Sequence, residues 1–437
     1  MIPASDASDN LAQADSDLLE LLRNQNSSPS SQETEAVISL EQAIEIANQS
    51  NRDIEQARIA IQQAQAAVQE EVASYRPDLT VSASGDYDFP VVSDGEDGSD
   101  VGSSIDLSYV LLDFGRRAAA VDISRTELQV SQLELMQVQQ TVRLDVATLY
   151  YTLQNAIEEV RINQAAVANS EQNLRDTEIR EQNGVGTRYD TLQAQTQLAE
   201  DQVNLLSAQN DRAIAQRELV QILGIGETLQ TVTVTPIARQ PTWSLSLEET
   251  LERAYDTRAE IEQQRLEQTI QQSTARLARA ELSPEISLST GYDFQNNLIE
   301  TSETINSWQD GLNISLNMEW TLYDGGVARA QARQAEAEEA IAASELINQQ
   351  DQIRLEVQTA YLTLQSETER ITAAEVGISS AQEGLRLARL RFQNGVGTQL
   401  EVLEAQSDLT DAESTLAQAI TAYNQATVEL ERSISGL

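Results

Sequence analysis

Apolar and polar residues repeat with a helical spacing along most of this chain. In the run from about 117 to 182, apolar residues recur every three or four positions: Val142, Val146, Leu149, Leu153, Ile157 and Val160. This spacing predicts a helix with one packed face and one hydrated face. A second run without proline extends from 327 to 393. At 1.5 Å per residue, each run predicts a helix of roughly 100 Å.

Two shorter helical runs accompany each long one. They cover about 40–75 and 189–223 in the first half of the chain, and 247–282 and 400–434 in the second. Each pair together approaches the length of one long helix, so two short helices stacked end to end would run beside a long one. This predicts a thin tube wall rather than a globule. The low aromatic content of 4% agrees with a wall that has no thick core.

Between the helices, two segments switch to strict alternation. Residues 79–112 and 285–322 each predict a β-hairpin in which apolar residues alternate with Ser, Thr, Asn and Asp. Six aromatic residues lie on these strands: Tyr87, Phe89, Tyr109, Tyr292, Phe294 and Trp320. Strand length and aromatics suit a lipid-facing band with an interfacial aromatic girdle. Hairpins packed on a soluble core are the alternative, but the thin helices offer no core to receive an apolar face.

Four strands are too few to close a barrel. Unpaired backbone groups in lipid are costly, and known membrane barrels start at about eight strands. We therefore expect each chain to lend two hairpins to a barrel shared with other copies. Two chains would supply eight strands and three would supply twelve, and strand arithmetic alone does not choose between them.

The chain is an internal duplication. The hexapeptide Gln-Asn-Gly-Val-Gly-Thr occurs at 182–187 and again at 393–398. The sequence predicts four parts: a polar, flexible segment (1–38), a first structural repeat (39–224), a linker (225–245) and a second repeat (246–437). Each repeat has the order helix, β-hairpin, long helix, tip turn (183–187 or 394–398) and helix. If the protein is exported, this is a mature form with a new initiator, Met1.

Composition excludes several functional classes. The net charge is −42, all 28 basic residues are arginine, and histidine and cysteine are absent. Nucleic acid is not an expected partner, because phosphate binding needs clustered basic residues. Histidine- or cysteine-based catalysis and the usual zinc ligands are excluded, so we expect no enzyme, metal or cofactor. A hydrolase with paired carboxylates would need a cluster, whereas the 70 acidic residues spread along solvated helix faces.

These features resemble the TolC family of outer-membrane efflux and secretion ducts over nearly the whole of 39–436. The motifs that carry the resemblance are Arg76-Pro-Asp78, Ser283-Pro-Glu285, Asp113-Phe-Gly115, Tyr323-Asp-Gly-Gly326, and Arg391-Phe-Gln-Asn-Gly-Val-Gly-Thr398 followed by Val402-Leu-Glu-Ala405. The resemblance implies an α+β membrane protein, a homotrimer with a twelve-stranded β-barrel in the outer membrane of a Gram-negative bacterium. The barrel would continue into the periplasm as a twelve-helix α-barrel.

The resemblance also implies partners and site residues. A periplasmic adaptor (a membrane fusion protein) and an inner-membrane transporter, ABC or proton-driven, would engage the tip, and outer-membrane lipid would surround the barrel. The implied docking positions are Gly184, Val185, Gly186, Thr187, Gly395, Val396, Gly397 and Thr398. An acidic ring at the tunnel entrance would be formed by Asp190, Glu401 and Glu404, although Gln193 interrupts the pattern in the first repeat. Taken alone, the glycines also fit ordinary helix C-caps.

The expected function is therefore a passive exit duct of a tripartite efflux pump or a type I secretion system, opened by its partners. The alternative is a soluble periplasmic coiled-coil scaffold or adhesion protein, which would be recovered without detergent. Cargo is expected to be set by the pump, so the sequence does not distinguish drugs, metals, proteins or lipids.

Overall fold

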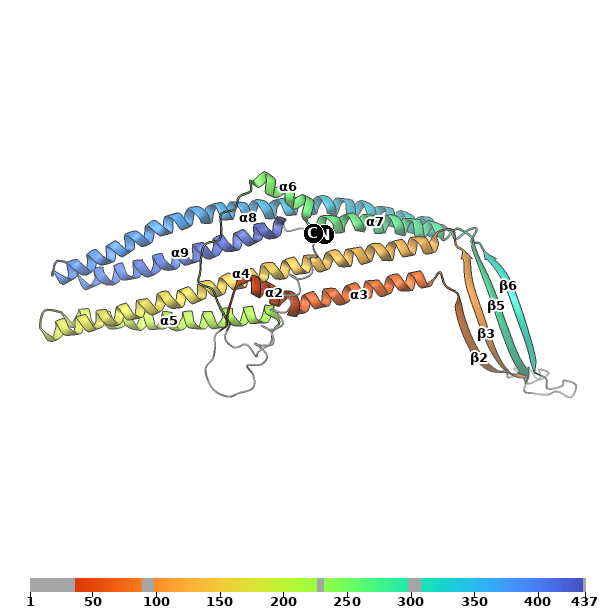
Figure 1. The fold of residues 1–437 in the computed structure, drawn as a ribbon, viewed down its shortest axis with the longest axis horizontal. Coiled ribbons are helices and arrows are strands. Elements are labelled where there is room, and N and C mark those ends of the chain that lie inside the picture. Colours follow the sequence, from red (N-terminus) through yellow and green to blue (C-terminus); the bar gives the residue numbers. More distant parts are fainter. Residues whose placement is uncertain (1–35, 89–97, 226–231, 298–307, 435–437) are drawn as a thin grey trace, which may run out of the picture.

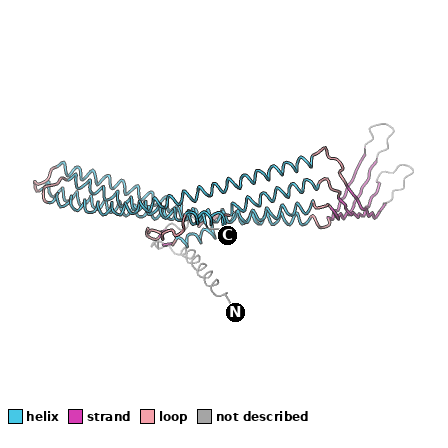
Figure 2. Tube along the Cα trace, turned by 90° about the horizontal axis from the view of Figure 1, so that it is seen from above, coloured by secondary structure: helices cyan, strands magenta, loops and turns pink. Residues whose placement is uncertain are grey.

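The computed structural model describes residues 36–88, 98–225, 232–297 and 308–434, which form a long, thin molecule (Figure 1). Helices occupy most of its length, and the strands of the main sheet lie at one end (Figure 2). Both tip turns lie at the opposite end. Most of the polar segment predicted to be flexible, residues 1–35, lies outside the described residues, as does Phe89.

Two long helices form the frame of the molecule. The helices are α2 (Leu40–Ser50), α3 (Arg52–Ala73), α4 (Arg116–Gln182), α5 (Arg188–Leu223), α6 (Leu247–Thr257), α7 (Ala259–Ala280), α8 (Val327–Gln393) and α9 (Gln399–Ile434). The long helices α4 and α8 have 67 residues each. Helices α3 and α5 pack on α4, and α7 and α9 pack on α8. The end-to-end stack of short helices therefore forms in both halves.

The first helical run of each half is a pair of helices, and the prediction of a single helix is wrong. Asn51 ends α2 and caps α3, because its side chain accepts hydrogen bonds from the N–H groups of Asp53 (2.8 Å) and Ile54 (3.3 Å). Arg258 takes the same place between α6 and α7, with an extended backbone (ψ 120°). A single extended residue does not interrupt the spacing of apolar residues enough to reveal either break.

The stacked helices of the first half meet at a close joint. The Asn51 side chain donates to the carbonyl oxygen of Ile222 near the end of α5 (2.9 Å). Gly224 follows with a φ of +70°, and a Cβ there would lie 2.2 Å from the carbonyl oxygen of Ser50. Glycine is required by both the left-handed backbone and the close approach. The joint thus determines how α5 continues into α3.

A small two-stranded sheet lies halfway along the molecule. Strand β1 (Ala36–Ile38) pairs in parallel with β4 (Val232–Val234). The hydroxyl of Tyr150 donates to the carbonyl oxygen of Ile38 (3.1 Å) and shares a hydrogen bond with the hydroxyl of Thr235 (2.7 Å). The flexible segment predicted over 1–38 is therefore corrected at its last three residues, because burial of Ile38 and pairing with β4 hold them in place.

The main sheet joins the two hairpins edge to edge. Its strands are β2 (Asp78–Asp88), β3 (Gly98–Leu112), β5 (Glu285–Asn297) and β6 (Gln309–Glu319). Their order is β2-β3-β5-β6, and every pairing is antiparallel. Strands β3 and β5 connect the halves, with Ile105 opposite Tyr292. The duplicated hairpins therefore form one sheet with β2 and β6 at its edges.

Strand β6 is shorter than the hairpin boundary at 322 predicts. Its last residue, Glu319, pairs with Glu285, which is the first residue of β5, so no partner remains beyond it. Strand β3 reaches Leu112 because a register shift after Val110 adds a residue. Trp320 lies just past the strand, where its indole N–H donates to the carbonyl oxygen of Leu282 (3.1 Å).

An aspartate stabilises each turn that connects a strand to the following long helix. The carboxylate of Asp113 accepts from the backbone N–H (2.8 Å) and Nε (2.7 Å) of Arg117, and that of Asp324 accepts from the N–H of Ala328 (2.6 Å). Burial raises the pKa of Asp113, but the hydrogen bonds from Arg117 bring it below its usual value. The hydrogen bond from Ala328 lowers the pKa of Asp324. Both ionised carboxylates therefore stabilise the folded state at pH values above the ordinary aspartate pKa. This stabilisation is lost as the pH falls through the lowered pKa values of the folded state.

The core is spread along the helix interfaces instead of filling one centre. In the first half it includes Tyr150, Leu153 and Leu219, and in the second half Ile353 and Tyr423. Helix α4 also packs on α7 and α9. The two halves therefore share one continuous wall of helices that carries the sheet at one end and the tip turns at the other.

Candidate functional site at the helix tips and the apolar sheet face

The turn between α4 and α5 reverses the chain with two glycines. Gly184 has a φ of 71°, in the left-handed region where glycine commonly ends a helix. The N–H groups of Val185 (2.9 Å) and Gly186 (3.0 Å) both donate to the carbonyl oxygen of Arg180. A Cβ on Gly186 would lie 3.0 Å from the Cβ of Arg180. The turn therefore packs directly on the last turn of α4.

The turn between α8 and α9 repeats this geometry. Gly395 has a φ of 74°, and the N–H groups of Val396 (3.0 Å) and Gly397 (3.1 Å) donate to the carbonyl oxygen of Arg391. The Nε of Arg391 also lies 3.4 Å from a carboxylate oxygen of Glu401. The identical hexapeptides therefore form matched reversals.

The residues assigned to an acidic ring begin the helices that follow these turns. The hydroxyl of Thr187 accepts from the N–H of Asp190 (3.2 Å), and the Asp190 carboxylate accepts from the N–H of Thr187 (3.1 Å). The hydroxyl of Thr398 likewise accepts from the N–H of Glu401 (3.2 Å). Glu404 lies one turn further along α9 and is exposed. The Asp190 carboxylate thus completes a capping box, and the Glu401 carboxylate pairs with Arg391, whereas Glu404 has neither contact among the described residues.

Each tip turn presents one apolar side chain to solvent. Val185 is 67% exposed and Val396 is 70% exposed. The eight positions assigned to docking fall in these two turns, both at the end of the molecule remote from the sheet (Figure 1). Each turn therefore combines N–H groups that donate to the preceding helix with one exposed valine.

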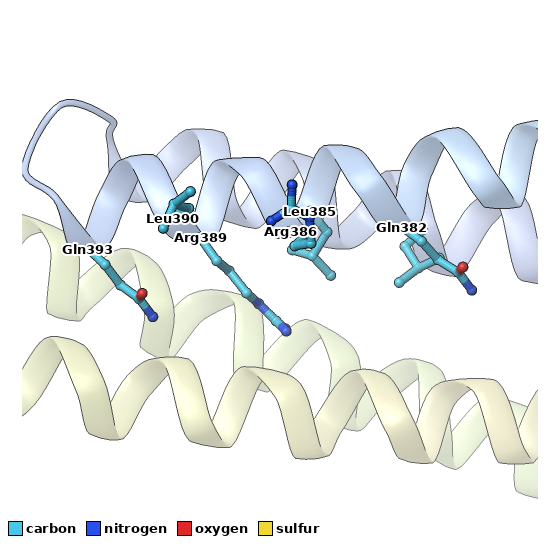
Figure 3. A pocket seen from close by; sticks show the side chains of 7 residues that line it. Gln382, Leu385, Arg386, Arg389, Leu390 and Gln393 are labelled. Carbon is cyan, nitrogen blue, oxygen red and sulfur yellow. The ribbon is translucent and has the colours of Figure 1, made fainter.

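Near the tips, the two halves touch through arginine side chains. The guanidinium of Arg180 lies over the ring of Phe392, 4.5 Å from its centroid, and Arg389 donates to the amide oxygen of Asn169 (3.1 Å). Figure 3 shows Arg389 and Gln393 pointing from α8 toward the helices of the first half. The groove in this view is lined by Gln382, Leu385, Arg386, Arg389, Leu390, Gln393 and Leu409.

A buried polar cluster behind the tips is absent from the sequence prediction. The Ser170 hydroxyl donates to the Asp201 carboxylate, which also accepts from the amide of Gln197 (3.0 Å). The Gln406 amide donates to the hydroxyl of Ser170 (3.1 Å). These contacts tie α4, α5 and α9 together. Single polar residues within helical runs rich in Gln, Asn and Ser offered no signal for this cluster.

The main sheet has one apolar face that the chain itself leaves exposed. On β6 this face carries Leu312, Ile314, Leu316 and Met318, all exposed. They lie opposite Tyr292, Thr290, Leu288 and Ile286 of β5. The other face is polar, as where the hydroxyls of Ser289 and Ser315 form a hydrogen bond (2.7 Å). A large exposed apolar surface indicates contact with a membrane or a partner.

The aromatic residues assigned to a girdle lie at different levels of the sheet. Tyr109 pairs with Leu288 and Trp320 follows β6, both toward the helices, whereas Tyr292 and Phe294 lie further along β5. The Phe294 ring stacks on Trp308, with centroids 4.5 Å apart. Trp308 was missed by the sequence reading. Tyr87 belongs to β2, but its side chain and all of Phe89 lie outside the described part of the chain.

Within the described residues, none of the helices is both long enough and apolar enough to cross a membrane. The same residues contain no group of three or more acidic side chains placed to hold a metal ion.

Comparisons with known proteins agree with this architecture. A family model described as outer membrane efflux protein matches residues 43–225 and 250–436. The outer membrane protein TolC of Vibrio cholerae is 24% identical over 322 residues, covering 73% of each chain. The pyoverdine export outer membrane protein OpmQ of Pseudomonas aeruginosa is 25% identical, covering 79% of this chain and 72% of that one. The structure of the outer membrane protein VceC from Vibrio cholerae covers 91% of this chain and 96% of its own, with 22% identity and a TM-score of 0.76.

Like these proteins, the chain has a wall of long helices with a β-sheet at one end and helix-reversing turns at the other. This architecture is that of the outer-membrane channels. The chain belongs to the outer membrane efflux protein family, the TolC family. It is an outer-membrane exit duct that extends into the periplasm of a Gram-negative bacterium. The sequence-based expectation of family, function and location is confirmed, and the soluble scaffold is not favoured.

Proposed function

We propose that three copies of this chain form one duct, with a twelve-stranded barrel in the outer membrane and a twelve-helix tunnel in the periplasm. The main support is the sheet: in the described residues, β2 and β6 each pair on one side only. An open edge in lipid leaves backbone groups without partners. Pairing of β2 with β6 of the next copy removes every edge and turns the apolar face outward.

Exposed apolar residues on the helices also support assembly. Val203 and Leu206 of α5, and Leu355 and Leu362 of α8, point away from the chain's own core. A neighbouring copy would cover such stripes and continue the helical wall around a tunnel. Structural repeats over 39–224 and 246–437 with a linker at 225–245 are supported by the two matched segments, 43–225 and 250–436.

The duct is passive, and its partners open it. A periplasmic adaptor docks on the tip turns at Gly184, Val185, Gly186 and Thr187, and on their counterparts Gly395, Val396, Gly397 and Thr398. An inner-membrane transporter supplies the energy and selects the cargo. Six matched turns in a trimer offer a near-sixfold rim to the adaptor. The proposal is supported by the matched geometry of the two turns and by the apolar residue at each apex.

The native mass of the protein extracted from membranes tests the assembly. Light scattering with the detergent contribution subtracted is expected to give three chains that carry a micelle. A particle recovered without detergent would mean that the apolar strand face is buried in protein. Two chains in a micelle would overturn the twelve-stranded barrel but keep the protein in the membrane.

The acidic ring is proposed to consist of Asp190, Glu401 and Glu404 at the tunnel entrance. Because Glu404 has no capping role, Glu404→Gln changes the charge while leaving both turns intact. In single-channel recordings at low salt, the potassium-to-chloride permeability ratio of the variant is expected to fall. Carboxylates attract cations when little salt screens them, and the variant has one fewer carboxylate per chain. Glu375→Gln, an equal charge change in an exposed part of α8 away from the tip, serves as the control. An unchanged ratio for Glu404→Gln would remove this residue from the ring.

The girdle is proposed to include Tyr87, Phe89, Tyr109, Tyr292, Phe294 and Trp320. It is supported by the exposure of Tyr292, Phe294 and Trp320 beside the apolar sheet face. Aromatic rings of this kind prefer the boundary between lipid and water.

A further inference from the structure

A groove lined by arginine lies between α7 and α8. The lining residues belong to the ends of these helices that approach the main sheet (Figure 1). Arg279 of α7 and Arg329 and Arg333 of α8 line it. Its apolar lining residues are Leu282, Ala328 and Ala332, and its volume is about 600 Å³. Three arginines around one groove are unusual in a chain with a net charge of −42.

One residue that lines the groove, Leu282, is in contact with the residue that follows β6. Trp320 follows β6 and continues the alternation of the apolar residues Ile314, Leu316 and Met318, which occupy every second position. Its indole N–H donates to the carbonyl oxygen of Leu282 (3.1 Å), and Leu282 lines the groove. A molecule seated on the arginines could therefore extend along Leu282 and Trp320 onto the apolar face.

The charge of the groove is only partly compensated. Glu336 is its one acidic lining residue, and its carboxylate forms a salt bridge with Arg279. Among the ion pairs of the described residues, Arg329 and Arg333 have no carboxylate partner. The Nε of Arg333 donates only to the carbonyl oxygen of Arg329 (3.4 Å). Two guanidinium groups are thus left to attract an anion.

The first half of the chain shows that the fold does not require these arginines. The duplication pairs Ser283 with Arg76 and Asp324 with Asp113, that is, with offsets of 207 and 211 residues. These offsets place Val72, Ala118 and Asp122 where the groove has Arg279, Arg329 and Arg333. The same helix pair therefore folds in the first half without any of the three charges.

We propose that this groove binds the phosphodiester headgroup of an anionic glycerophospholipid from the membrane leaflet that faces the helices. The guanidinium groups of Arg329 and Arg333 would donate to the phosphate oxygens, for which arginine has matching fork geometry. One acyl chain would lie along Leu282 and Trp320. Basic pockets beside membrane-embedded segments recognise such headgroups. The inference rests on the proposed placement of the sheet in the membrane and adds one lipid site per chain.

Lipid retention by the full-length protein tests the site. The detergent-extracted protein would be incubated with phosphatidylglycerol or phosphatidylcholine and examined by native mass spectrometry. The wild type is expected to keep one phosphatidylglycerol per chain and about tenfold less phosphatidylcholine. The double variant Arg329→Gln with Arg333→Gln is expected to lose phosphatidylglycerol about tenfold. Arg265→Gln changes an exposed arginine of α7 that lies further from the sheet than Arg279, and this variant should retain the lipid.

Four outcomes separate this inference from the proposed assembly. Equal retention of both lipids, or unchanged retention in the double variant, would overturn the lipid site while a detergent-bound trimer left the duct intact. Loss of lipid by Arg265→Gln to the same extent would also overturn it, because general surface charge would then explain binding. A protein that carries no detergent would overturn the proposed membrane sheet itself.

Discussion

The variant Ile314→Arg is expected to abolish the detergent-bound trimer. Ile314 lies at the middle of β6, is 72% exposed and belongs to the apolar face. An arginine on the lipid-facing side of a barrel costs about 2–4 kcal/mol at the membrane midplane. Three copies in a trimer therefore cost roughly 6–12 kcal/mol, which is comparable to the whole stability of many proteins. The native mass and the amount of protein in the membrane fraction measure the effect.

The neighbouring residue provides a matched control. Ser315 lies on the opposite face of β6, where its hydroxyl bonds to that of Ser289. Ser315→Arg introduces the same side chain one position away, but toward the polar side. We expect this variant to assemble. Equal assembly of Ile314→Arg and Ser315→Arg would contradict a lipid-facing sheet, and equal failure of both would show only that β6 tolerates no large charge.

The second large effect is expected at the tips. Replacing Val185 and Val396 by aspartate places a charge at the apex of each turn, where both valines are well exposed. If an adaptor covers these positions, every tip then buries an unpaired carboxylate. We expect adaptor affinity to fall roughly a hundredfold, since each 1.4 kcal/mol is about a factor of ten. Binding of the purified adaptor and export in cells measure the loss.

The matched control variant replaces both valines by threonine, which keeps the branched shape without adding a charge. This variant should retain most adaptor binding. Neither change touches the backbone hydrogen bonds of Val185 and Val396 to the preceding helix. The trimer is therefore expected to form in both variants. Wild-type adaptor binding by the aspartate variant would remove the tip turns from the docking surface.

The long helices and the strands of this protein were predictable from sequence. Helices α4 and α8 begin and end within one residue of the predicted runs, 117–182 and 327–393. Their length allows many turns of the same spacing to reinforce one another. The strands were predictable because alternation with a period of two contrasts with the helical runs on either side.

Features that depend on single residues were harder to predict. The breaks at Asn51 and Arg258 each involve one extended residue, which a window of many residues averages out. The end of β6 at Glu319 depends on where its partner β5 begins, so β6 alone does not define it. For the candidate site, the turns around Gly184 and Gly395 were visible as a repeated motif, whereas the cluster around Ser170 and Asp201 was not.

The sequence by itself determined the long helices, the strands and the capped tip turns, because each depends on neighbours within a few residues. It also determined the duplication, because the same motifs occur twice in the same order. Only the tertiary structure decided that β3 and β5 join the two hairpins into one sheet. It also brought Arg279 to Arg329 and Arg333, about fifty residues away along the chain. Pairings between distant segments depend on how whole helices and strands pack, and no local pattern of residues records that packing.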